Sequence, residues 1–221
     1  MTANNLVASK KHNRIWITTD AAGYDDAGFI CTFGSKIRPI PEWSAVITGR
    51  GNAFGLDTAA RELTRRASSF DELVGIASRE LPLIVAEFRL YRPFELNLAG
   101  FFRGRPMIFF IRTPGDHDSS GMGMRPYLIY PMGSTLFGPW PSDDAIAAAG
   151  FVEPDPGDTP ANIVSSICDL IRLQRRVPAE DGYSRVGGCA ELTTISPDSI
   201  ETQIFHRWPD DRIGQRMTTE H

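Results

Sequence analysis

Cysteine is scarce in this chain, and its spacing excludes two common uses of the residue. The 221 residues contain only Cys31, Cys168 and Cys189, which lie far apart and form no C-x-x-C pair. An odd number of isolated cysteines does not fit a disulfide framework, and a structural zinc site needs paired ligands. We therefore expect buried free thiols, and we expect no metal and no other cofactor.

Long apolar runs and an excess of positive charge are also missing. No stretch approaches the roughly 20 apolar residues that span a bilayer, and the N-terminal MTANNLVASKKHNR lacks the apolar core of a signal peptide. The formal net charge of −4 gives no basic footprint for nucleic acid. We therefore expect a soluble, cytoplasmic protein that binds neither membranes nor nucleic acid.

What the chain does contain is a regular succession of strand and helix patterns. A hydrophobic content of 42% in 221 residues suits one substantial core, so we expect a single domain over residues 1–208 and a loose tail over 209–221. Two groups of strands with two separate pairs of helices suggest stacked sheets faced by helices on both outer sides. Apolar spacing predicts helices at 54–67, from Ser69 onward, at 142–149 and at 158–176, and strands at 14–19, 28–33, 36–40, 44–48, 96–102, 106–113, 126–131, 186–195 and 199–205.

Charged and small residues recur beside the predicted strands. Asp20 ends the run RIWITTD, and Lys36 begins KIRPI sixteen residues later. The next strand closes on Thr48 and Gly49, and a serine follows glycine in YPMGS. The stretch EDGYSRVGG places an aspartate three residues before a serine. Taken singly, each motif also fits an ordinary strand-end ion pair or a plain turn.

In their order and spacing, these motifs resemble the proteasome β-subunits and HslV-type peptidases of the N-terminal nucleophile (Ntn) hydrolase superfamily. The resemblance spans most of the chain, from the first strand to the terminal hairpin. It implies an α+β fold, a four-layer αββα sandwich, which assembles into a homo-oligomer. It also implies a threonine-type hydrolase that cleaves a bond in a peptide or small amide substrate.

The resemblance further implies roles for individual residues. The hydroxyl of an N-terminal threonine would be the nucleophile, and its free α-amine would accept the proton. A neighbouring lysine would favour the anionic form of the nucleophile, and an aspartate would hold that lysine. The residues that match are Thr2 as the nucleophile, Lys36 and Asp20 as the activating pair, Gly49 as the backbone oxyanion donor, and Asp181, Ser184 and Ser134 as groups that orient the amine.

The position of the nucleophile leaves two functions open. An ungapped count of sixteen residues back from Asp20 reaches Asn4, which has no hydroxyl and cannot perform this chemistry. If the first hairpin turn is two residues longer, the strand begins at Thr2, and removal of Met1 would expose its α-amine. The sequence therefore allows a peptide or amide hydrolase that uses Thr2. The alternative is a catalytically silent protein of the same fold that serves as an assembly or binding component.

Overall fold

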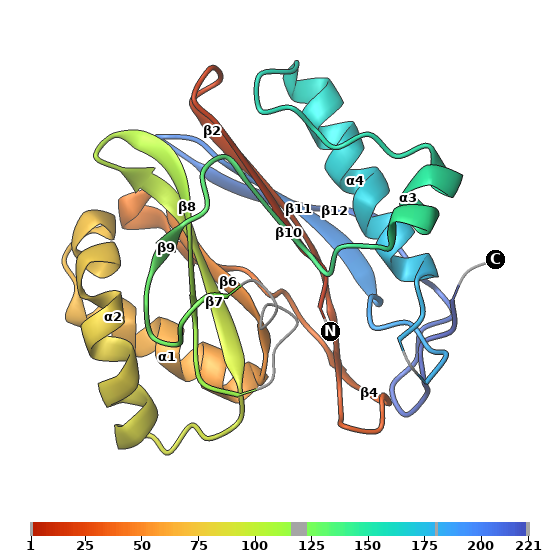
Figure 1. Cartoon of the computed structure of the whole chain (residues 1–221), viewed down its shortest axis with the longest axis horizontal. Coiled ribbons are helices and arrows are strands. Elements are labelled where there is room, and N and C mark those ends of the chain that lie inside the picture. Colours follow the sequence, from red (N-terminus) through yellow and green to blue (C-terminus); the bar gives the residue numbers. More distant parts are fainter. Residues whose placement is uncertain (1, 116–122, 180, 220–221) are drawn as a thin grey trace.

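Two five-stranded antiparallel sheets form the centre of the molecule (Figure 1). The computed structural model describes residues 2–115, 123–179 and 181–219. The first sheet has the order β10 (Thr135–Gly138), β1 (Asn4–Ser9), β2 (Arg14–Asp20), β11 (Cys189–Ile195) and β12 (Ile200–Arg207). The second has the order β5 (Arg38–Ile40), β6 (Ala45–Gly51), β7 (Phe94–Phe102), β8 (Arg105–Arg112) and β9 (Tyr130–Pro131). A separate ribbon pairs β3 (Ala22–Tyr24) with β4 (Ile30–Phe33).

The strands β1 and β2 are buried on both faces, which explains the unbroken apolar run at the centre of each. Leu6 and Ile17 belong to the cluster between the two sheets, together with Val46 of the second sheet. Val7 and Trp16 point the other way and pack on α4. Successive side chains of a strand alternate between faces, so two apolar faces need an unbroken apolar run.

Four α-helices of the described residues lie outside the sheets, and side-chain caps fix where they begin. The Asn52 side chain accepts the N–H of Gly55 at the start of the first helix, and Ser69 accepts the N–H of Glu72 at the start of the second. Figure 1 shows this first pair against the second sheet and the other two helices on the side of the first sheet. The helices are α1 (Ala53–Arg66), α2 (Phe70–Glu87), α3 (Asp143–Ala149) and α4 (Pro160–Arg176), and a 3₁₀ turn, η1, covers Pro41–Trp43.

This architecture corrects the prediction of a four-layer αββα sandwich of the Ntn hydrolase type with a helical pair on each outer side. The structure consists mainly of antiparallel sheets with four helices, and strands (33% of residues) outweigh helices (28%). The helices do not form two matching pairs, because α3 has only seven residues and buries none of them. Its sequence, DDAIAAA, offers one large apolar side chain, which is too little to anchor a helix to a sheet.

The C-terminal segment is not the loose tail that we expected from residue 209 onward. Met217 is fully buried and packs with Ala22 and Ile30. The carbonyl of Met217 accepts the N–H of Ser184, and that of Gln215 accepts the N–H of Ile30. One buried apolar side chain and a few backbone hydrogen bonds are enough to fix a segment that reads as polar. In the described parts of the chain, no helix has both the length and the apolar character to cross a membrane.

Candidate functional site

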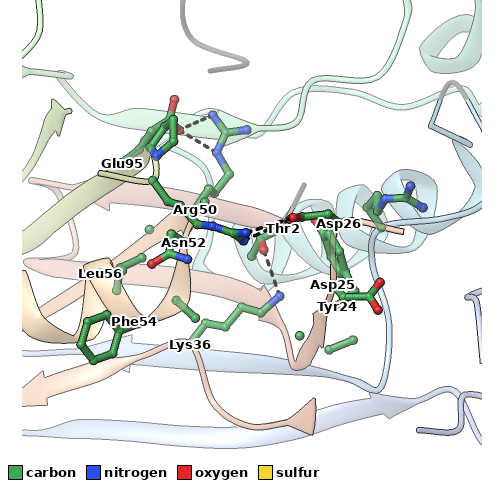
Figure 2. Close-up of a pocket in the computed structure, with 18 of the residues that line it drawn as sticks. Thr2, Tyr24, Asp25, Asp26, Lys36, Arg50, Asn52, Phe54, Leu56 and Glu95 are labelled. Carbon is green, nitrogen blue, oxygen red and sulfur yellow. Dashed lines mark hydrogen bonds and ion pairs between the residues drawn. The ribbon is translucent and has the colours of Figure 1, made fainter. Parts of the chain in front are cut away.

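A pocket of about 710 Å³ opens where the ends of both sheets meet the β3–β4 ribbon (Figure 2). Thr2, which lies shortly before β1, lines it beside Lys36. One wall is the start of the ribbon and its turn, residues 22–26, and the opposite wall is the end of β6 and the start of α1, residues 49–54. Leu56, Arg38, Arg92, Pro93, Glu95 and Arg185 complete the lining.

Lys36 contacts both Thr2 and Asp20. The Lys36 Nζ donates to Thr2 Oγ1 at 3.1 Å and to Asp20 Oδ1 at 2.8 Å. The side chain of Asp20 is fully buried, and that of Lys36 is 15% exposed. The pairing of Asn4 with Thr19 in the β1–β2 register brings the start of the chain alongside Asp20, whose Oδ1 also accepts the N–H of Ala3 at 3.0 Å. Strand register therefore brings Thr2 near Asp20, and the ion pair with Asp20 holds Lys36 beside the threonine hydroxyl.

Burial changes the acidity of Lys36. The pKa of its amine is lowered from the ordinary value, because removal from water penalises the charged form. The charge and the hydrogen bond of Asp20 oppose that shift and stabilise the ammonium ion. A cation at 3.1 Å from the Thr2 hydroxyl favours loss of the hydroxyl proton. The arrangement can therefore make Thr2 a better nucleophile than a threonine in water.

Gly49 lies on β6 and lines the same pocket as Thr2. A Cβ at this position would overlap the Glu95 carbonyl oxygen of the neighbouring strand and would lie 2.8 Å from the Leu56 side chain. Only glycine fits between β7 and α1 here, so the requirement is one of space. The absence of a side chain also leaves the backbone of Gly49 open to a molecule in the pocket.

The three residues expected to orient the amine have other partners in the described part of the chain, and no hydrogen bond joins them to Thr2. Asp181 pairs with Arg185 at 2.6 Å, and this hydrogen bond lowers the pKa of the Asp181 carboxyl. Arg185 itself lines the pocket. Ser184 is buried, and its hydroxyl donates to the carbonyl of Val186 and accepts the N–H of the same residue.

Ser134, the third of these residues, lies just before β10 and accepts an N–H from β1 through its carbonyl. It does not line the pocket. The role of Ser134 in orienting the amine of Thr2 stays a prediction, as do the roles of Asp181 and Ser184.

The structure also decides between the two registers that the sequence allowed. Asn4 lies in β1, where its amide donates to Thr48 Oγ1 at 2.9 Å. Its side chain is therefore turned to β6, while Thr2 is the residue beside Lys36. The β1–β2 hairpin connects Ser9 to Arg14.

Two ion pairs at the pocket were not predicted from the sequence. Arg50 donates to Glu95 at 2.7 and 3.0 Å, and Arg92 pairs with Asp26 at 3.1 Å. All four residues line the pocket. Figure 2 shows the Arg50–Glu95 contact on one side of Thr2 and Asp26 on the other. The only sequence signal was charge next to a predicted strand end, which is too common to single out a pair. Among the described residues, no three His, Cys, Asp or Glu side chains gather as metal ligands.

Comparison with known proteins gives a likeness in structure. No family model and no curated protein matches the sequence. The structure is similar to the solved structure of an Anbu mutant from Hyphomicrobium sp. strain MC1, with a TM-score of 0.67 and 10% sequence identity over 96% of this chain and 89% of that chain. Anbu is a proteasome-like protein, so the chain has a proteasome-like fold.

This result corrects the assignment of the chain to the N-terminal nucleophile hydrolase superfamily as a proteasome β-subunit or HslV-like member. No family model supports that membership, and an identity of 10% shows a shared fold alone. Short motifs such as an aspartate and a lysine sixteen residues apart contain too few residues to define a family. A fold also hosts many unrelated chemistries, so function has to be argued from the site.

Proposed function

We propose that this chain hydrolyses a peptide bond or the amide bond of a small molecule, with Thr2 as its nucleophile after removal of Met1. The proposal places the reaction in the cytoplasm. One observation carries it: the Lys36 ammonium donates to both the Thr2 hydroxyl and the buried Asp20 carboxylate. An ion pair that served only to stabilise the strands would have no need of a hydroxyl at a pocket surface.

The first half of the reaction forms an ester. The α-amine of Thr2, whose unperturbed pKa would be about 7.7–8.0, takes the proton of Oγ1 directly or through one water molecule. Oγ1 attacks the carbonyl carbon, and Lys36 stabilises the negative charge that develops on the hydroxyl oxygen. The ammonium group of Thr2 then gives its proton to the leaving nitrogen as the carbon–nitrogen bond breaks, which leaves an acyl ester on Thr2.

The second half releases the acid. A water molecule loses a proton to the α-amine of Thr2 and attacks the ester carbonyl, and Oγ1 leaves with the proton that the amine returns. In both halves the carbonyl oxygen becomes an oxyanion beside Gly49. The backbone at this position can approach it closely, because Gly49 has no side chain.

The test has two stages. Intact mass of the purified protein shows whether Met1 is removed, and incubation with a β-lactone, an electrophile that acylates hydroxyl groups, shows whether Thr2 reacts. We expect removal of Met1, a single adduct on Thr2 and turnover of an amide substrate library. The substitution Thr2→Ala should abolish both labelling and turnover, whereas Thr2→Ser should keep them in part.

A protein that retains Met1 after native expression, forms no adduct and turns over no amide would overturn the proposal. The catalytically silent assembly or binding component would then be the function of this fold. Self-association of the chain also stays a prediction. Light scattering at micromolar concentration tests it, because a homo-oligomer has several times the 24.4 kDa mass of one chain.

A further inference from the structure

A buried ion pair joins α4 to the C-terminal segment behind the candidate site. Arg175 donates to Asp211 at 2.7 and 3.3 Å, and both side chains are 3% exposed. Each partner also bonds to the backbone of segment 186–188: Arg175 to the carbonyl of Val186 at 2.5 Å, and Asp211 to the N–H of Gly188 at 2.6 Å. The pair therefore holds this segment at two adjacent points.

Segment 186–188 in turn contacts the candidate site. The N–H of Gly187 donates to Asp20 Oδ2 at 3.2 Å, while Oδ1 of the same carboxylate faces Lys36. The carbonyl of Gly187 accepts the N–H groups of Ala21 and Ala22, which lead into the ribbon wall of the pocket. One peptide segment thus fixes both the rotation of the Asp20 carboxylate and the first residues of β3.

The packing at Gly187 shows how closely the pair approaches. A Cβ on Gly187 would overlap the Met217 sulfur and the Asp211 carboxylate and would lie 2.8 Å from the Arg175 guanidinium. A hydrogen-bonded guanidinium has a fixed planar fork, so it holds its partners in one geometry. Burial of a charge pair is also a poor source of stability, because apolar side chains of similar volume often do as well. A role in geometry accounts for the pair better than a role in stability.

We propose that Arg175 and Asp211 are positioning residues for the reaction of Thr2, and that they act through Gly187 on the Asp20 carboxylate. This inference rests on the proposed function. Neither side chain lines the pocket, so neither touches a substrate in it. Their effect is to keep Asp20 Oδ1 directed at Lys36, which in turn faces the Thr2 hydroxyl.

The test uses two variants that change the local charge in opposite directions. Asp211→Asn removes a negative charge, and Arg175→Met removes a positive charge. Both should loosen segment 186–188, so kcat should fall by about tenfold in each, with KM nearly unchanged. Arg175→Lys, which keeps the charge but not the planar fork, should restore only part of the rate.

The titration of Lys36 separates positioning from a simple charge effect. The carbon next to the Lys36 amine can be followed by NMR with labelled lysine, without any substrate. A less well-directed Asp20 stabilises the ammonium ion less, so the pKa of Lys36 should fall in both variants. A long-range charge effect would instead lower it in Asp211→Asn and raise it in Arg175→Met.

Arg66→Met is the matched control. Arg66 also lies on a helix, pairs with Glu80 and Glu87 at 3.0 and 2.6 Å, and is partly buried on the α1–α2 side. This variant should change the melting temperature while leaving kcat and the Lys36 titration as in the wild type. Opposite shifts of the Lys36 pKa in the two test variants, or shifts in Arg66→Met as large as theirs, would overturn the inference.

The inference and the proposed function fail in different ways. Absence of a Thr2 adduct in the wild type removes the function, whereas a reactive wild type with unaltered kcat in folded Asp211→Asn removes only the positioning role. Thermal unfolding of each variant establishes that it is folded. Asp211→Asn is the milder change, because asparagine keeps the shape of the side chain and one oxygen acceptor.

Discussion

The α1–α2 side and the α4 side of the molecule hold their sheets by different forces. On the α1–α2 side, fully buried Leu63, Leu73, Leu81 and Ile84 pack on apolar side chains of β6, β7 and β8. The apolar cluster under α4 is smaller and centres on Trp16, with two isoleucines of the helix. Apolar packing is strong but non-directional, so the first side is suited to supply stability.

The α4 side adds buried hydrogen bonds that are directional. Thr18 Oγ1 donates to the carbonyl of Ile167, and the amide groups of Gln174 and Asn5 exchange two hydrogen bonds of 2.9 Å. Gln174 also donates to the carbonyl of Pro139 at 2.7 Å. These contacts fix β1, which follows Thr2, and β2, which ends at Asp20. The difference suggests that one side of the molecule provides stability and the other provides the geometry of the site.

Removal of the Lys36 amine should give the largest effect on activity. In Lys36→Met the Thr2 hydroxyl loses its only cationic partner among the described contacts, so turnover and β-lactone labelling should fall by about two to four orders of magnitude. Steady-state kinetics and mass spectrometry measure the loss. If folded Lys36→Met labels as fast as the wild type, Lys36 does not activate Thr2.

A cavity on the α1–α2 side should reduce stability and spare the chemistry. Leu81 is fully buried in the large cluster, so Leu81→Ala should lower the free energy of unfolding by about 2–5 kcal/mol. Denaturant unfolding measures this loss, and kcat per folded molecule should stay as in the wild type. A clear fall in kcat would show that this side also shapes the site.

The sequence predicted helices and strands better than it predicted how they pack together. The helices expected at 54–67, 142–149 and 158–176 are confirmed as α1, α3 and α4 to within two residues at each end, because caps and apolar spacing are local signals. The short strand β10, with half-buried residues, has no such signal, and it was missed. The prediction of four layers was wrong because the burial of a helix depends on the elements that pack against it, which local spacing does not show.

The candidate site shows the same limit. Asp20 and Lys36 could be picked out by the sixteen residues between them, and Thr2 by allowing a longer first hairpin turn; in the structure Lys36 contacts both. The partner of the second Asp20 oxygen could not be predicted, because Gly187 is 167 residues away in the sequence. A turn motif such as DGYS predicts local hydrogen bonds. Here Asp181 accepts from Arg185, and Ser184 accepts from Val186. The motif therefore does not identify a partner for a distant amine.

A change to the buried amide pair should move stability and activity together. Gln174→Leu leaves the Asn5 side chain without this partner, which should cost about 1–3 kcal/mol of unfolding free energy. Because Asn5 belongs to β1, kcat should also fall, by a smaller factor than in Lys36→Met. The double variant Asn5→Leu/Gln174→Leu should recover part of the stability, since it removes both unsatisfied groups. A stability loss with unaltered kcat would contradict the geometric role of the α4 side.

The pH dependence of turnover should show the smallest effect and gives the finest test of the site. Rates should rise as the Thr2 α-amine loses its proton, near its unperturbed pKa of about 7.7–8.0. They should fall again as Lys36 loses its proton. Because burial lowers the Lys36 pKa below its ordinary value of 10.5, this falling limb should come at a lower pH than for a surface lysine.

Lys36→Arg sharpens this measurement, because a guanidinium keeps its proton throughout the accessible pH range. Whatever rate this variant retains should show the rising limb and no falling limb. Lysine NMR on the wild type should place the Lys36 titration at the midpoint of its falling limb. If the falling limb persists unchanged in Lys36→Arg, it comes from the titration of another group. Catalysis would then not depend on the ionised form of Lys36.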